Sequence, residues 1–172
     1  MKTKHESDSN SYFAFAIDKN RTIKAYARFS TKANDISLYK ESLSVNKDTK
    51  IAIIHAIGAT KDIQGESQRW KSDEKIEEEK VGTFLYKKIF SFCLEQNSKL
   101  IIADVCIYPF PNLSSLILHS KFDFIPFKIN IEDKHFDQKK KKFFLVRYIR
   151  LIKALSPYAK LKRLPDETLY LD

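Results

Sequence analysis

Two histidines stand in surroundings from which an imidazole could move protons. His55 lies inside the apolar segment 50–59, and His119 follows the short segment 112–118. A histidine side chain titrates near neutral pH, so either residue could act as a general acid or a general base. Each also has a structural alternative, because His55 could be a hydrogen-bonded core residue and His119 an exposed residue on a short helix. The role of each therefore depends on the elements that hold it.

Apolar and aromatic runs in the first two thirds of the chain predict a sheet. Residues 12–29 form two aromatic-rich runs around a polar turn, which predicts a β-hairpin. A weaker strand is expected within 36–45. Segments 50–59 and 100–107 are apolar on both faces, as is typical of central strands.

One longer and one short helix are expected around the second central strand. Val81, Leu85 and Phe92 recur on one helical face, which predicts a helix that begins at Val81 and stops at Asn97-Ser98. Asn112 follows two prolines and can cap a short helix through Leu118.

The last third of the chain predicts a second hairpin. Segments 122–131 and 143–149 read as its strands, joined by the charged loop 132–142. Beyond Leu151 we expect one short helix interrupted at Pro157, followed by coil.

These elements predict a mixed α/β sheet in a single domain. A chain of 172 residues is long enough for one domain with a substantial core. We expect a polar disordered tail over 1–10, the domain over 11–150 and a C-terminal extension over 151–172.

Two motifs within residues 81–124 resemble the core of the GCN5-related N-acetyltransferase (GNAT) superfamily. The first is the helix start Val81-Gly82-Thr83-Phe84-Leu85. The second has the form N-x-x-A-x-x-L-Y-E-K-x-G-F in the superfamily, and its matching residues here are Asn112, Ser115, Leu118, Lys121 and Phe124. Asp123 replaces the motif's glycine and is compatible with a turn at positive φ. The resemblance, over residues 50–150, implies a mostly antiparallel sheet with a splayed parallel pair of strands and flanking helices.

The resemblance also implies an activity. GNAT enzymes transfer an acetyl group from acetyl-CoA to an amine acceptor, which attacks directly in a ternary complex. His55 would deprotonate the amine, alone or through water. His119 stands where the superfamily often has a tyrosine that protonates the departing thiolate, and Tyr108 is a second candidate for that step. The acceptor cannot be read from the sequence.

The coenzyme-binding residues are likewise implied by the resemblance. Backbone groups of 57–59 would pair with the pantetheine arm as an added strand does, and amides at a helix start would hold the pyrophosphate. Lys121 or the loop 139–142 would lie near the 3′-phosphate. The implied set is Ile57, Gly58, Ala59, Gln64, Gly65, Val81, Gly82, Thr83, Asn112 and Lys121.

An insertion departs from the superfamily pattern. The phosphate loop normally runs directly into the helix, whereas here about fifteen residues rich in Glu and Lys separate Gly65 from Val81. If this segment displaces the loop, the acids in 77–80 would repel a pyrophosphate. The inserted segment 65–80 could also be a lid or a partner surface.

Positive charge is concentrated near the C-terminus. The net charge is +9, and residues 134–163 contain eleven Lys or Arg and a single acid. This part could dock an acidic partner, and Lys139–Lys142 followed by Phe143 and Phe144 has the character of a single-strand nucleic-acid binder. The alternative to an enzyme is therefore a catalytically degenerate GNAT-like fold that binds protein or nucleic acid through this basic part.

Several other function classes lack their signature. The histidines and the two cysteines, Cys93 and Cys106, show no metal-ligand spacing, so no metal site is expected. Both cysteines are expected to be free thiols of a cytoplasmic protein. No apolar window is long enough for a membrane span, and no nucleophile-elbow motif is present.

Overall fold

A computed structural model describes residues 11–31, 43–45, 48–64, 67–72, 75–163 and 169–171. The described residues form a six-stranded sheet in the order β1-β2-β4-β7-β9-β8, in which β4 and β7 are parallel and the other pairs antiparallel. Its strands are β1 (Tyr12–Ile17), β2 (Ile23–Ser30), β4 (Lys50–Ala59), β7 (Ser98–Tyr108), β8 (Ile125–Asp137) and β9 (Lys142–Ala154). The predicted mixed α/β sheet with one parallel pair is confirmed.

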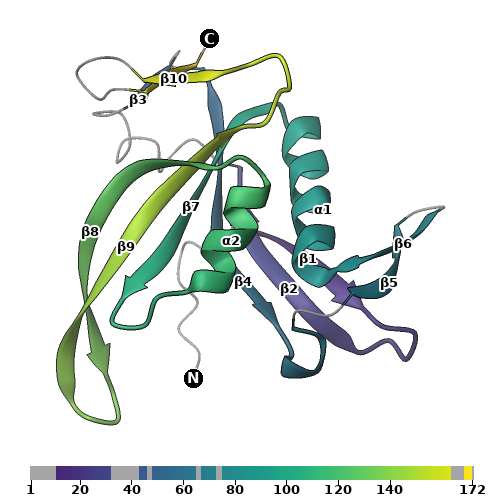
Figure 1. Ribbon diagram of the computed structural model, residues 1–172, viewed down its shortest axis with the longest axis horizontal. Helices are drawn as coiled ribbons and strands as arrows, with labels where there is room; N and C mark the ends of the chain where they lie inside the picture. Colours follow the sequence, from purple (N-terminus) through teal and green to yellow (C-terminus); the bar gives the residue numbers. More distant parts are fainter. Residues whose placement is uncertain are drawn as a thin grey trace.

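Two helices cover one face of this sheet (Figure 1). Helix α1 (Val81–Glu95) lies beside α2 (Leu113–Lys121), and both pack on a core that includes Ile54, Ile101 and Leu151. The predicted end of α1 and start of α2 are confirmed, because Asn97 has φ 60° just after α1 and Asn112 caps α2. Helix α2 continues to Lys121, beyond its predicted end at Leu118. Asp123, which replaces the motif's glycine, has φ 57°.

The opposite face is covered by a small sheet instead of the predicted C-terminal helix. Strands β10 (Leu161–Arg163), β11 (Leu169–Leu171) and β3 (Leu43–Ser44) form it. Leu43 and Leu169 are buried against Ile51, Ile102 and Ile152. The prediction of a helix beyond Leu151 is wrong because β9 continues to Ala154, and the leucines of the extension are needed to cover this second core.

The charged segment 132–142 is not the predicted loop. Strands β8 and β9 continue through most of it, and only residues 138–141 form the turn. Cross-strand pairs explain the extension: Arg147 Nε donates to Glu132 Oε1 at 2.9 Å, and the rings of Phe136 and Phe143 lie 5.0 Å apart. Such pairs stabilise a two-stranded ribbon without burying either face.

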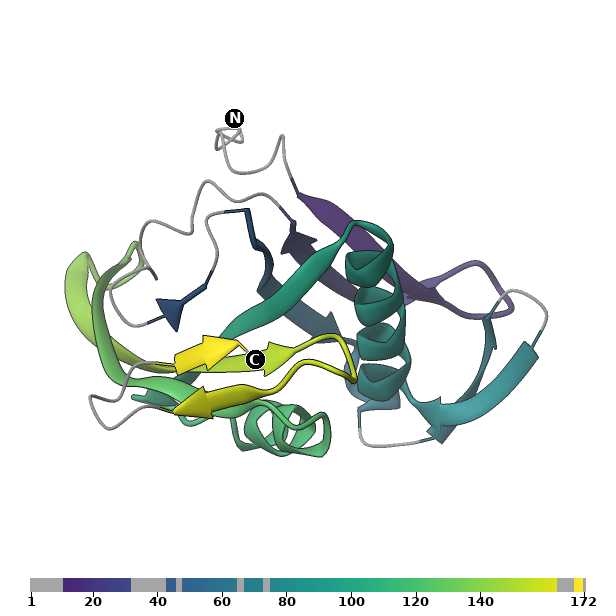
Figure 2. The same ribbon diagram turned by 90° about the horizontal axis from the view of Figure 1, so that it is seen from above.

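The inserted segment forms a β-hairpin. Strand β4 ends in the 3₁₀-helix η3 (Lys61–Ile63), and β5 (Ser67–Ser72) and β6 (Lys75–Lys80) then pair before α1 begins. Figures 1 and 2 show this hairpin beside α1, at the end of the molecule opposite to the turn of β8 and β9. The predicted tail 1–10 and most of the weak strand within 36–45 lie outside the described residues.

Candidate active site

The two parallel strands separate half-way along their length. Pairing between β4 and β7 runs from Lys50–Ser98 to Ile54–Ala103. Beyond that point β4 pairs only with β2 on its other side, and β7 pairs only with β9. Residues 55–59 therefore have no strand partner on the β7 side among the described residues. Such an unpaired strand edge can bind an extended chain through its amide and carbonyl groups.

His55 lies where the two strands begin to separate. Register with β2 shifts here, because Ile54 pairs with Phe29 and Ala56 with Arg28, which leaves His55 as the extra residue of a β-bulge. Its imidazole is exposed, and Nε2 lies 2.9 Å from Ser30 Oγ. The exposure excludes the core-residue alternative. A bulge turns a side chain out of the regular alternation, and bulges are common beside active sites.

His119 is buried, which excludes the alternative of an exposed residue on a short helix. Its side chain is only 3% exposed, so it is not a surface residue. Nδ1 donates to the Ser115 carbonyl at 2.7 Å, which leaves Nε2 to accept from the Tyr86 hydroxyl at 2.5 Å. Burial lowers the pKa of His119, although the hydrogen bond to Ser115 partly opposes the shift. The geometry favours a neutral imidazole that joins α2 to α1.

Tyr86 is the residue that sequence reasoning missed. It is fully buried, and burial raises its pKa. Its ring stacks on Phe122 at 5.1 Å and meets Phe90 edge-on at 5.4 Å. The available signal was spacing, because Tyr86 follows Gly82 by one helical turn and so lies on the same face.

Gly82 makes close packing of the two helices possible at the first turn of α1. A Cβ atom at this position would lie 2.8 Å from Leu118 Cδ2, so the absence of a side chain lets α2 pack directly on the first turn of α1. Lys80 is the N-cap of α1 and provides no side-chain cap to the amides of Val81, Gly82 and Thr83. An uncapped helix start presents amide donors and positive potential, which suits an anion.

The two ends of the inserted hairpin lie next to each other. Ser67 and Lys80 are paired at the open end of β5 and β6, so the chain leaves and returns at neighbouring points. Trp70 fixes the hairpin to α1: it is 3% exposed, stacks on Phe84 at 5.6 Å, and its Nε1 donates to the Glu79 carbonyl at 3.0 Å.

Two of the acids expected to repel a phosphate are paired. Glu79 Oε2 lies 2.9 Å from Lys87 Nζ, and Glu78 Oε2 lies 3.6 Å from Arg69 Nε. Gly65, which was predicted to bind the pyrophosphate, lies outside the described residues. The hairpin therefore brings less unpaired negative charge to the start of α1 than the sequence suggested.

The structure brings Gln64 and Ala59 together. Gln64 Nε2 donates to the Ala59 carbonyl at 2.9 Å, which fixes the chain just after β4. Ile57 and Ala59 pack against the helix-side core. Gly58 faces the other way: a Cβ there would lie 2.8 Å from Tyr26 Cε1, so this glycine accommodates an aromatic ring.

Asn112 and Lys121 lie at opposite ends of α2. Asn112 Oδ1 accepts from the Ser115 amide at 3.0 Å, and its own amide donates to the Cys106 carbonyl at 3.0 Å. Asn112 thus joins α2 to the end of β7. Lys121 is exposed in the last turn.

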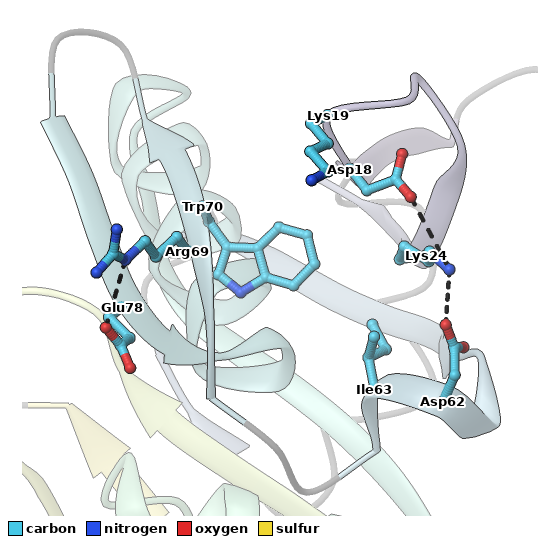
Figure 3. A pocket seen from close by; sticks show the side chains of 8 residues that line it. All are labelled: Asp18, Lys19, Lys24, Asp62, Ile63, Arg69, Trp70 and Glu78. Atoms are coloured by element: carbon cyan, nitrogen blue, oxygen red, sulfur yellow. Dashed lines mark hydrogen bonds and ion pairs between the residues drawn. The ribbon is translucent and has the colours of Figure 1, made fainter.

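A cavity of about 690 Å³ lies between the β1–β2 turn, η3 and the inserted hairpin (Figure 3). Its cations and anions balance, and most are paired, as in the 2.6 Å bridge from Lys24 to Asp62. None of the predicted site residues lines it. Its lining is Asp18, Lys19, Lys24, Asp62, Ile63, Arg69, Trp70 and Glu78. A polyphosphate would find little net attraction there.

Other predicted features can be compared directly with the structure. Cys93 and Cys106 are both free thiols, and burial raises the pKa of Cys93 to about 12. In the part of the chain that the structure describes, no cluster of His, Cys, Asp and Glu could hold a metal ion. No described helix is long and apolar enough to cross a membrane.

The fold matches solved structures, although the sequence matches no protein-family model and no curated protein. Arabidopsis thaliana NAA60, solved in complex with a bisubstrate analogue, aligns with TM-score 0.59 and 9% identity over 84% of this chain and 75% of that one. The ribosomal-protein-S18-alanine N-acetyltransferase of Escherichia coli aligns with TM-score 0.54 and 10% identity over 89% of this chain and 72% of that one. A Desulfovibrio desulfuricans protein assigned to the GNAT family aligns with TM-score 0.53 and 10% identity over 88% of this chain and 73% of that one. The chain has the GNAT fold. Three features of this GNAT-fold chain lie toward the carboxyl ends of the parallel strands. They are the separation of β4 and β7, the bulge at His55 and the start of α1.

Proposed function

We propose that the protein is an N-acetyltransferase that transfers an acetyl group from acetyl-CoA to an amine. The observation that carries this proposal is the separation of β4 from β7, which begins at the exposed His55. The named neighbours add support, since one is an N-acetyltransferase and another was solved with a bisubstrate analogue.

The coenzyme would lie along the free edge of β4. Amide and carbonyl groups of 57–59 would pair with the pantetheine arm, although the Ala59 carbonyl already accepts from Gln64. The uncapped amides at the start of α1 would face the pyrophosphate. Lys121 would contribute at most long-range attraction, because it lies at the far end of α2.

The chemistry would begin with His55. Its imidazole would remove a proton from the acceptor ammonium, directly or through water, and the neutral amine would attack the thioester carbonyl. Collapse of the tetrahedral intermediate breaks the carbon–sulfur bond and releases the thiolate. We assign its protonation to Tyr108, which is 47% exposed at the end of β7, in preference to the buried His119.

The test is a calorimetric titration with acetyl-CoA and desulfo-CoA, followed by an acceptor screen that detects free thiol. Micromolar binding of both ligands and acceptor-dependent thiol release are the expected results. An absence of coenzyme binding by the folded protein would refute the proposal.

Gly82 provides a matched pair of variants for the phosphate site. Gly82→Asp and Gly82→Asn add nearly the same volume against Leu118, but only Asp adds negative charge. We expect Gly82→Asp to weaken coenzyme binding about tenfold more than Gly82→Asn, because a carboxylate at a helix start opposes a bound anion. Equal losses would mean that Gly82 matters only for helix packing.

A further inference from the structure

Among the described residues, the turn end of β8 and β9 is a two-stranded arm that pairs with no other strand. We define the arm as residues 131–146. Pairing of β9 with β7 ends at Arg147 and Tyr108, and residues 142–146 pair only with β8. Figure 1 shows this part of the two strands extending past the end of β7. A two-stranded ribbon has no core of its own, so its side chains are available on both faces.

Large aromatic side chains occupy both faces of the arm near the turn. Phe136 and Phe143 are cross-strand partners, 50% and 71% exposed, with ring centroids 5.0 Å apart. Phe144 is 43% exposed on the opposite face, beside His135. Exposed aromatic rings gathered in one place are unfavourable in water and typically mark a binding surface.

The acids of the arm are mostly engaged in contacts within β8, β9 and their turn. Glu132 accepts from Arg147 at 2.9 Å. Asp137 Oδ1 accepts from the backbone amides of Lys139 and Lys140 at 2.9 and 3.1 Å, and so shapes the turn. These carboxylates leave the lysine side chains of the arm without an internal counter-ion.

Five lysines carry the positive charge of the arm. They are Lys134, Lys139, Lys140, Lys141 and Lys142. None of their side chains forms an ion pair with a described residue, and all are exposed. Lys134 lines a shallow hollow of about 340 Å³ together with Phe143, Phe144 and Leu145, so charge and aromatic rings lie side by side.

A further contact of cation and ring lies where β9 meets the end of β7. The Arg147 guanidinium lies 5.5 Å from the centre of the Tyr108 ring. Phe110, just beyond β7, is 84% exposed. Cationic and aromatic side chains thus occur both on the arm and at the end of β7.

We propose that this arm binds single-stranded nucleic acid. Lysines on the arm would contact phosphates, and the Phe136, Phe143 and Phe144 rings would stack on bases, which is how sequence-tolerant single-strand binders combine charge and aromatic surface. A membrane surface fits less well, because the turn that would enter the bilayer first consists of Gln138 and three lysines.

The test is fluorescence anisotropy with a labelled oligo-uridine, at low and at physiological salt. Saturable binding that weakens with salt is expected. Phe143→Ala combined with Phe144→Ala should reduce the affinity about tenfold or more, since stacking on one aromatic ring contributes that much. Tyr158→Ala is the matched control, because Tyr158 is 94% exposed but lies outside the arm.

Charge is tested separately by changing Lys139–Lys142 to glutamine. Each phosphate contact removed should lower the slope of log affinity against log salt by about 0.7. Lys99→Gln, an exposed lysine elsewhere, should leave the slope unchanged.

Several results would overturn the proposal. They include no saturable binding of the oligonucleotide, equal loss of binding in Tyr158→Ala, and binding of polyglutamate as tight as that of oligo-uridine. Binding to anionic vesicles without oligonucleotide binding would assign the arm to a membrane and would also overturn it. The Phe143 and Phe144 variant should still bind acetyl-CoA normally, so the result is independent of the proposed acetyl transfer.

Discussion

His55 and His119 have the same side chain in opposite environments. His55 projects from a β-bulge into solvent and contacts Ser30, whereas His119 is enclosed by two helices and holds Tyr86. The first arrangement leaves an imidazole accessible to a substrate, and the second uses both ring nitrogens inside the protein. Accessibility to solvent therefore distinguishes a candidate base from a packing residue.

The strongest test of this contrast is His55→Ala. We expect kcat for acetyl transfer to fall about a hundredfold or more, because a general base typically contributes that much. The free energy of unfolding should change by less than about 0.5 kcal/mol, as for an exposed residue. Steady-state kinetics and urea denaturation measure the two quantities. His135→Ala is the control, since His135 is also exposed but lies on the arm. A loss of stability without a loss of kcat would reverse the assignment.

His119→Ala should show the opposite profile. The substitution opens a cavity and leaves the buried Tyr86 hydroxyl without its partner, so we expect a loss of about 2–4 kcal/mol in the free energy of unfolding. At a temperature where the variant is folded, kcat should stay within a few-fold of the parent value. A hundredfold drop in kcat in a stable variant would instead support the predicted role as proton donor.

Tyr86→Phe isolates the hydrogen bond from the packing. The ring and its stacking on Phe122 are retained, but Nε2 of His119 loses its donor, so we expect a loss of about 1–2 kcal/mol. The double variant with His119→Ala should lose less than the sum of the two single changes, because both remove the same hydrogen bond. Additive losses would show that the pair is not coupled.

A smaller effect should appear in the pH dependence of stability. Burial lowers the pKa of His119 below its unfolded value of about 6.5. The unfolded chain then binds more protons in acid, so this contribution to stability is complete above about pH 6.5 and declines as the pH falls toward the folded pKa. Denaturation midpoints of the parent and of His119→Gln across this range provide the measurement. An identical pH dependence in both proteins would contradict it.

The predictable part of the fold was the part encoded in local signals. Apolar runs placed β4 and β7, and Asn97 and Asn112 marked the helix ends because their backbone and capping preferences are local. The second hairpin was predicted, but the continuation of its strands through 132–142 was missed. That continuation is held by cross-strand pairs such as Glu132 with Arg147, which are far apart along the chain.

For the candidate site residues, the sequence predicted the secondary-structure element of each residue better than its burial and contacts. The resemblance to the GNAT superfamily pointed to His55 and Gly82, and their places on a strand and at a helix start were predicted. The β-bulge at His55 was not visible in the sequence because it depends on register with β2. The burial of His119 depends on Tyr86, which is distant in sequence and comes from another helix. Contacts between elements thus give the two histidines different environments, although the sequence suggested a proton-transfer role for both.

The pairing of Ser67 with Lys80 also explains how this fold can hold an insertion between the phosphate-loop position and α1. Antiparallel partners have Cα atoms about 4.5–5.5 Å apart, not much more than the roughly 3.8 Å between consecutive residues. The hairpin could therefore be inserted or deleted with little displacement of the chain on either side of it. What such a change would alter is the surface of α1, because Trp70 would no longer shield Phe84.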